Sequence, residues 1–419
     1  MNVRFRWLWT SAGLANLGDG ITITALPLIA LAAGAQPGEV AMVTASATIA
    51  WPLLGLHAGW VVDRLSPHLL LAMVNGARAA SLVALTVAIS LDNSVFAMTL
   101  ATAFIFGAAE TLVDTALIAG IPRTVDRRDL TAANARIEAT INVNNQLAGP
   151  PLAGLLIGTT GILASSSGGG LYAFAALAAI GLMCATQRSA APHPRASVDL
   201  HHTPVKVLEG IRYLWNHRLQ RELTLLTAGM SIVWGAWSAT FVLHAVSPGP
   251  LDLDTAAYGL LLTGMAAGGI LASIFTERLQ ARLSSTSLLF IDTVGTLGLA
   301  LPAALNAPLP VIAIGIIVAG AGSTVWRIIV AVIRQQSTPL HLIGRVYSAS
   351  RVISWGALPL GASLGALGVQ TLGLTPLFWA ESLVALGICA WFAMRMPAIR
   401  TRIVRAADET PSTSIQPSG

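Results

Sequence analysis

The chain has little charge and almost no cysteine. Only 10% of its 419 residues are Asp, Glu, Lys or Arg, whereas soluble domains carry about 25%. This scarcity excludes an ordinary soluble domain, which covers its surface with charged side chains. The two cysteines, Cys184 and Cys389, both lie in apolar runs. They therefore provide neither a disulfide framework nor a set of metal ligands.

Signatures of catalysis and of nucleotide binding are also missing. His57 and His244 are isolated in separate apolar runs, and no H-E-x-x-H pattern occurs. His193, His201 and His202 share a polar stretch, but their spacing is not that of a metal site. The absence of a P-loop, G-x-x-x-x-G-K-S/T, argues against direct use of ATP. We therefore expect no enzyme, no catalytic residue, no cofactor and no metal site.

The chain does have many long hydrophobic runs, and hydrophobic residues make up 54% of it. A helix needs about 20 mostly apolar residues to cross a bilayer. We predict an all-α polytopic membrane protein with twelve membrane-spanning helices at residues 7–33, 40–62, 70–90, 95–120, 134–159, 163–187, 222–247, 256–276, 285–304, 309–332, 345–370 and 374–395. The first run is too long for the core of a secretory signal, so we interpret it as an uncleaved span.

A polar stretch at residues 188–221 divides the predicted spans into six and six. We therefore predict an N-terminal six-helix bundle at 1–187 and a C-terminal six-helix bundle at 222–395, joined by this linker. Residues 396–419 form a tail that we expect to be disordered.

Arginine is distributed unevenly between the linkers. The linkers after even-numbered spans hold several arginines, whereas those after odd-numbered spans hold no Lys or Arg. Because cytoplasmic loops carry an excess of basic residues, we predict that both termini are cytoplasmic in a multi-pass protein of the cell membrane. The net charge of +5 is then a sign of topology. We expect the lipid bilayer, and no nucleic acid, as a partner.

The two halves repeat one design at a nearly constant offset. The stretch WVVDRLSPHLL aligns with SIFTERLQARL, and GAAETLVDTALIAGIP aligns with GAGSTVWRIIVAVIRQ. Repeats of this kind are found in many secondary transporters, whose substrate site lies between the halves near the midplane.

Two motifs carry a family resemblance. The loop after the second span resembles the signature G-x-x-x-D-R-x-G-R-K through Gly59, Asp63 and Arg64, although Ser66 replaces a glycine of that turn. The fifth span contains AGPPLAG, in which Gly149, Pro150 and Gly154 match the exporter motif G-P-x-x-G-G. With LTAANAR and LIGRVYSASR, these motifs resemble the major facilitator superfamily. The chain is most similar to its macrolide-efflux and enterobactin-export branch.

The resemblance implies the major facilitator fold and roles for both motifs. In that superfamily the signature loop, which here would contain Asp63, latches the two halves together in the outward-open state. The alternative is an ordinary charged turn. Gly149 and Pro150 imply a kinked helix, since proline removes a backbone hydrogen bond. Whether that kink serves exporter gating or is only structural stays open.

Four charged residues lie inside predicted spans at matching depths. Arg78 and Asp114 are about 12 Å and 9 Å from the cytoplasmic ends of the third and fourth spans. Asp292 and Arg327 have the opposite signs in the ninth and tenth spans. Because an unpaired charge at this depth is costly, we expect Arg78 to pair with Asp114 and Asp292 with Arg327. The alternative is that each faces a water-filled cavity independently.

Asp19 and Glu110 are acids near the membrane midplane, in the first and fourth spans. The resemblance implies that both spans line the central cavity, so we expect proton coupling or substrate contact there. Intramembrane acids commonly serve as proton relays, and they could also attract a cationic drug. The alternative for Asp19 is a local hydrogen bond to Thr22 or Asn16, with a helix break between the glycines that flank it.

Other polar and aromatic residues are weaker candidates for the cavity. They are Asn142, Asn145, Gln146, Trp234, Trp237 and Glu381.

The sequence therefore predicts a secondary active transporter. We expect it to export amphipathic small molecules, drugs or natural products, by proton antiport with alternating access, and to act as a monomer. Its partners would be the bilayer, the small-molecule substrate and protons. The alternatives are a siderophore exporter of the enterobactin-export type, an importer, or a membrane protein that does not transport.

Overall fold

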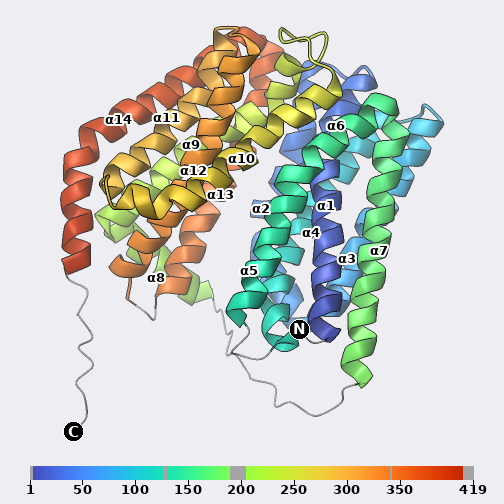
Figure 1. The fold of residues 1–419 in the computed structure, drawn as a ribbon, viewed down its shortest axis with the longest axis horizontal. Helices are drawn as coiled ribbons and strands as arrows, with labels where there is room; N and C mark the ends of the chain where they lie inside the picture. Colours follow the sequence, from blue (N-terminus) through green and yellow to red (C-terminus); the bar gives the residue numbers. More distant parts are fainter. Residues whose placement is uncertain (1–2, 126–129, 189–203, 340–341, 409–419) are drawn as a thin grey trace.

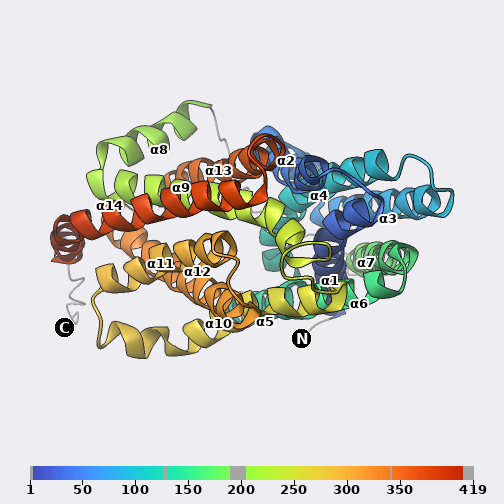
Figure 2. The same cartoon turned by 90° about the horizontal axis from the view of Figure 1, so that it is seen from above.

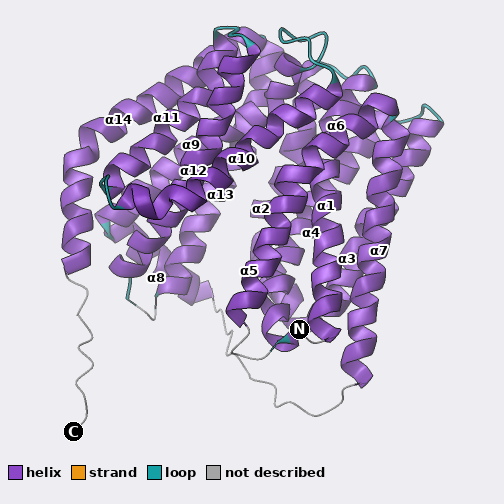
Figure 3. Cartoon of the chain, in the orientation of Figure 1, coloured by secondary structure: helices purple, strands orange, loops and turns teal. Residues whose placement is uncertain are grey.

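In the computed structural model, residues 3–125, 130–188, 204–339 and 342–408 are described. Nearly all of them are helical, as Figure 3 shows, and a lone β-bridge joins Val246 to Leu253. The helices are α1 (Val3–Ala32), α2 (Pro37–Arg64), α3 (Pro67–Ser90), α4 (Val95–Thr124), α5 (Leu130–Ile141), η2 (Asn142–Ala148), α6 (Gly149–Thr159), α7 (Gly161–Arg188), α8 (Pro204–Asn216), α9 (Arg218–Ala245), α10 (Thr255–Gln280), α11 (Ser285–Ala304), α12 (Leu309–Ser337), α13 (Ile343–Thr371) and α14 (Leu374–Asp408).

The all-α class is confirmed, whereas the count of twelve spans is not. In the part of the chain that the structure describes, 10 helices are long and apolar enough to cross a membrane. They are α1, α3, α4, α7 and the six helices from α9 to α14. The expected second span lies within α2, and the expected fifth span is divided between α5, η2 and α6.

The fifth span is divided by a π-helical segment. Residues Asn142–Ala148 form η2, and Pro150 and Pro151 follow in the first turn of α6. Proline lacks an N–H, so it fits the first turn of a helix, where that group has no intrahelical acceptor. A π-helical turn widens a helix and is frequent at functional sites. The GPP motif therefore begins a new helical segment.

Glycines in α1 permit close helix packing rather than a break. The helix is continuous from Val3 to Ala32. A Cβ on Gly18 would press on the ring of Tyr172, and one on Gly20 would overlap the backbones of Asn145 and Gly149. Small residues allow helix backbones to approach closely in this way. The helix break suggested for the glycines that flank Asp19 is therefore not formed.

Two groups of helices lie side by side, α1 to α7 and α9 to α14 (Figures 1 and 2). They meet at the ends of helices that point away from the N-terminus. There the Thr255 hydroxyl of α10 donates a 2.9 Å hydrogen bond to the Gly154 carbonyl of α6. A Cβ on Gly259 would overlap the Pro150 carbonyl, and one on Gly38 would overlap the side chain of Gln370. A cluster of alanines adds to this contact: Ala41, Ala239, Ala362 and Ala366.

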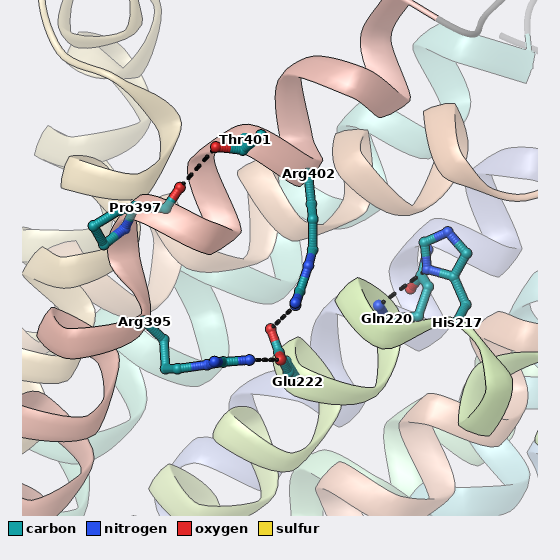
Figure 4. Close-up of polar contacts among 7 residues, drawn as sticks. All are labelled: His217, Gln220, Glu222, Arg395, Pro397, Thr401 and Arg402. Carbon is teal, nitrogen blue, oxygen red and sulfur yellow. Dashed lines mark hydrogen bonds and ion pairs between the residues drawn. The ribbon is translucent and has the colours of Figure 1, made fainter.

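An acid at the start of α9 holds the C-terminal part of α14. The two carboxylate oxygens of Glu222 each accept a 2.6 Å hydrogen bond, one from Arg395 and one from Arg402, as Figure 4 shows. Hydrogen bonds between ionised groups are about twice as strong as neutral ones. α14 continues past Pro397 to Asp408, so residues 396–408, which were expected to belong to a disordered tail, are helical.

Helix α8 packs on the same end of the C-terminal group. Its Leu214 is buried with Leu342, Val346 and Ala349. The Tyr213 hydroxyl donates a 2.7 Å hydrogen bond to the Ser337 carbonyl at the end of α12. Burial raises the pKa of the Tyr213 phenol, so the hydroxyl keeps the proton that it donates.

Candidate functional site

A cavity of about 530 Å³ lies between the two groups of helices. Its walls come from α1, α2, α3, α4, α5 and η2 on one side and from α9, α12 and α13 on the other. The residues of α9, α12 and α13 that line the cavity lie toward the end of the molecule at which α1 begins, called here the side of the termini. The contacts at Gly154 and Thr255 close the opposite side.

Asp19 and Arg78 form a buried ion pair at the edge of this cavity. Arg78 Nη1 lies 3.2 Å from Asp19 Oδ1, and the exposed fractions of the two residues are 0% and 5%. The Tyr172 hydroxyl of α7 donates a 2.7 Å hydrogen bond to the same Oδ1. One carboxylate thus joins α1 to both α3 and α7.

Aromatic rings complete the surroundings of Arg78. Its guanidinium carbon lies 5.3 Å from the ring centroid of Phe106 and 5.3 Å from that of Tyr172. The face of an aromatic ring attracts a cation, and the attraction is stronger away from water. The site therefore stabilises the arginine both by charge and by its aromatic neighbours.

The local partners suggested for Asp19 are engaged elsewhere or unused. Asn16 Nδ2 donates to the Ala12 carbonyl of its own helix at 2.9 Å. Thr22 Oγ1 has no hydrogen-bond partner among the described residues. The carboxylate of Asp19 is held by α3 and α7 instead.

The two predicted charge pairs have different outcomes. The side chain of Asp114 lies outside the part of the chain that the structure describes, so its pairing with Arg78 stays a prediction. Asp292 and Arg327 are both described and form no ion pair within 4.0 Å. The physical reason is orientation. Asp292 is buried against Gly322 of α12, whereas Arg327 is exposed and lines the cavity.

Glu110 and three amides also line the cavity. Glu110 extends from α4, and Asn142, Asn145 and Gln146 extend from η2. A fourth amide, Asn144, holds η2 in place by donating a 2.9 Å hydrogen bond to the Gly13 carbonyl of α1. The π-helical segment thus brings a row of polar groups to the side of the cavity opposite α12 and α13.

Trp234, Trp237 and Glu381 do not line this cavity, contrary to expectation. Trp234 Nε1 donates a 3.2 Å hydrogen bond to Thr296 of α11, and Trp237 is buried against Phe241. Glu381 is buried on α14, and neither of its oxygens has a hydrogen-bond partner among the described residues. These side chains therefore pack on faces of their helices that do not line the cavity.

The other predicted motif residues lie away from the cavity or cannot be placed. Gly149, Pro150 and Gly154 are buried where α6 meets α1 and α10. The side chains of Asp63 and Arg64, together with Gly59, lie outside the described set, although α2 extends through them.

The sequence reasoning missed the wall that the C-terminal group contributes. Trp51 of α2 stacks on Trp355 of α13 with ring centroids 4.8 Å apart. The guanidinium carbon of Arg351 lies 4.7 Å from the Trp355 ring and 5.5 Å from the Trp51 ring. Arg334 and Tyr347 also line this wall. The spacing of Arg351 and Trp355, four residues apart on a helix, was a signal that could have identified one face.

Two bundles of long apolar helices around a polar cavity define the class of a helical membrane transporter. The family described as transmembrane secretion effector, a branch of the major facilitator superfamily, has a model that matches residues 1–417. The chain therefore belongs to the major facilitator superfamily, whose members transport small molecules across membranes. The resemblance seen in the sequence motifs is thereby confirmed.

Individual relatives agree with this assignment. The chain is 26% identical over 393 residues to the multidrug efflux pump Tap of Mycolicibacterium fortuitum, covering 91% of this chain and 93% of the pump. Two solved structures share the fold. A point mutant of the nucleoside transporter NupG matches with a TM-score of 0.74 and 14% identity, covering 95% of this chain and 100% of its own. A bacterial homologue of the iron transporter ferroportin matches with a TM-score of 0.73 and 16% identity, covering 96% and 100%.

Proposed function

We propose that this chain exports amphipathic small molecules from the cell by proton antiport with alternating access. The observation that carries the proposal is the polar cavity between the two helix groups, which contains an acid at Asp19 and another at Glu110. A relative that covers nearly the whole chain is named as a multidrug efflux pump, which supports export of drug-like molecules. We place the protein in the cell membrane as a monomer.

The conformation supports alternating access. The halves meet at Gly154 and Thr255, and the cavity lies on the side of the termini. If both termini are cytoplasmic, as the arginine distribution predicts, this state receives substrate from the cytoplasm. Export then requires the Gly154 contact to open and the side of the termini to close.

We assign Asp19 as the residue that takes up and releases the proton exchanged for the substrate. In the ionised form its carboxylate binds Arg78 and accepts a hydrogen bond from Tyr172. A proton on Asp19 removes the opposite charge from Arg78, which changes how tightly α1 is held to α3. Intramembrane acids commonly serve proton transfer in transporters. Glu110 supplies a second acid in the same cavity, for proton transfer or for substrate contact.

The proposal is tested in proteoliposomes with an imposed pH gradient and two fluorescent amphipathic dyes, the cation ethidium and the anion 8-anilinonaphthalene-1-sulfonate. We expect wild-type protein to move at least one of the dyes against its gradient, and only when protons flow the other way. Asp19→Asn should abolish this coupling, and Glu110→Gln should reduce it. Asp92→Asn, in an exposed turn outside the cavity, is the matched control. Unchanged, gradient-sensitive transport in both cavity variants would overturn the coupling assignment.

A further inference from the structure

The charges that line the cavity are divided unequally between its two walls. The N-terminal wall holds Asp19 and Glu110, and Arg78 is paired with the first of these. The opposite wall holds Arg327, Arg334 and Arg351, and none of its described lining residues is an acid. That wall therefore presents positive charge to whatever enters the cavity. A charge buried in a membrane protein is costly, and such residues commonly mark a substrate pathway.

Arg327 is the arginine of this wall that is best placed to receive an anion. Its side chain is exposed to the cavity, and Nη2 contacts Thr324 Oγ1 at the long distance of 3.5 Å. It forms no ion pair within 4.0 Å with any described acid, Asp292 included. Most of the five N–H donors of its guanidinium are thus available. A guanidinium matches a carboxylate with two parallel hydrogen bonds.

An aromatic surface lies in the same cavity. Trp51 and Trp355 come from different halves, and their rings stack at 4.8 Å. Arg351 lies over the Trp355 ring at 4.7 Å. A planar ring of a ligand can stack on such a surface, and an acidic group on the ligand would meet the neighbouring arginines. A cavity of about 530 Å³ is of the size that takes drug-sized molecules.

We infer that the substrates of this transporter are aromatic anions: the ring packs on Trp51 and Trp355, and the acidic group binds Arg327 with support from Arg351. The inference rests on the proposed function, because it names the substrate class of the same cavity. It differs from the usual expectation for a cavity with acids, which is a cationic drug. Here Asp19 already holds Arg78, so that acid is not available to a cationic ligand while the pair is intact.

The test is equilibrium binding to purified full-length protein in lipid nanodiscs, without any pH gradient. Two probes carry the same ring and opposite charge: 1-naphthylacetate and 2-(1-naphthyl)ethylammonium. We expect the anion to bind roughly 10-fold or more tightly than the cation. Arg327→Gln should weaken binding of the anion by about the same factor, and binding of the cation should stay unchanged or become tighter. Arg327→Lys keeps the charge but cannot form the two parallel hydrogen bonds, so it should weaken binding of the anion less than Arg327→Gln does.

Controls separate this result from general damage. Arg282→Gln removes an arginine from an exposed turn outside the cavity and should not change the binding of either probe. Trp355→Leu should weaken the binding of both probes to a similar extent, because both carry the naphthalene ring. Equal binding of the two probes, a preference for the cation, no binding of either probe, or equal losses in Arg327→Gln would each overturn the inference. Since no gradient is present, a failure of proton-coupled export would leave the binding result intact.

Discussion

Arg78 of α3 and Asp19 of α1 form an ion pair of 3.2 Å inside the N-terminal helix group. The same carboxylate accepts a 2.7 Å hydrogen bond from Tyr172 of α7. Three helices that are far apart in the chain therefore meet at one acid. We expect this contact to affect stability as well as transport, and the two effects can be measured separately.

Loss of Arg78 should be costly. Arg78→Gln leaves the buried carboxylate of Asp19 without its opposite charge, and we expect the free energy of unfolding to fall by about 3–5 kcal/mol. The double variant Arg78→Gln with Asp19→Asn should be less destabilised than the sum of the two single variants, because neither charge is then left alone. Unfolding by dodecyl sulfate in mixed micelles measures each value. Additive losses would show that the two residues do not depend on each other.

The Tyr172 hydroxyl makes a smaller contribution to the same site. Tyr172→Phe keeps the ring that packs against Gly18 and Phe106 but removes the hydrogen bond to Asp19. A hydrogen bond to a charged group contributes about 1.5–3 kcal/mol, so we expect a loss in that range. The same unfolding assay measures it. A variant as stable as the wild type would show that water replaces the hydroxyl.

The sequence predicted the fold class, but it did not predict that Asp19 would pair with Arg78. Hydropathy runs locate helices along the chain, and so they place Asp19 and Glu110 near the midplane. They do not say which face of a helix meets which neighbour. The ion pair of Arg78 with Asp19 of α1 was not predicted. The predicted partner Asp114 has its side chain outside the described residues, so that pair stays a prediction. Trp237 and Glu381 were placed in the cavity for the same reason, since depth alone supported them.

The wall with Trp51 and Trp355 illustrates a second limit. These residues are more than half the chain apart, and their contact exists only because the two halves pack together. No local pattern connects them. By contrast, the GPP motif identified an unusual point in the fifth span from composition alone, because proline restricts the backbone wherever it occurs.

Close packing at Gly149 makes it sensitive to one added methyl group. A Cβ there would overlap the backbone of Gly20, and a backbone cannot rotate away as a flexible side chain can. We expect Gly149→Ala to lower the free energy of unfolding by about 1–3 kcal/mol. Gly387→Ala, in a helix where nothing lies within 4 Å of the new carbon, is the matched control and should be neutral. Equal effects of the two substitutions would contradict the packing argument.

The ion pairs of Glu222 should hold one end of α14. Glu222→Gln removes the charge that binds Arg395 and Arg402. Both arginine side chains are partly exposed, and water screens such pairs, so the expected loss is only about 1 kcal/mol. Hydrogen exchange resolved along the chain should be faster in the part of α14 after Pro397 and unchanged around the cavity. Faster exchange throughout the protein would mean that Glu222 supports the whole C-terminal group.

Finally, the contact between α6 and α10 should control which state the transporter occupies. A Cβ on Gly259 would overlap the Pro150 carbonyl of the other half, and this contact exists only while the side away from the termini is closed. We therefore expect Gly259→Ala to favour the opposite state, in which the halves approach each other at the termini. Spin labels at Arg6→Cys on α1 and Arg218→Cys on α9, both exposed sites, report that distance.

The measurement requires a background without Cys184 and Cys389, replaced by serine. Double electron–electron resonance measures the distance between the two labels. Gly259→Ala should shift this distance to shorter values, whereas Gly387→Ala should leave it unchanged. A ligand changes such an equilibrium only through its different affinities for the two states. The same labels should therefore also respond to 1-naphthylacetate if that probe binds the present state more tightly. Identical distance distributions for Gly259→Ala and the wild type would show that this contact does not hold the halves together.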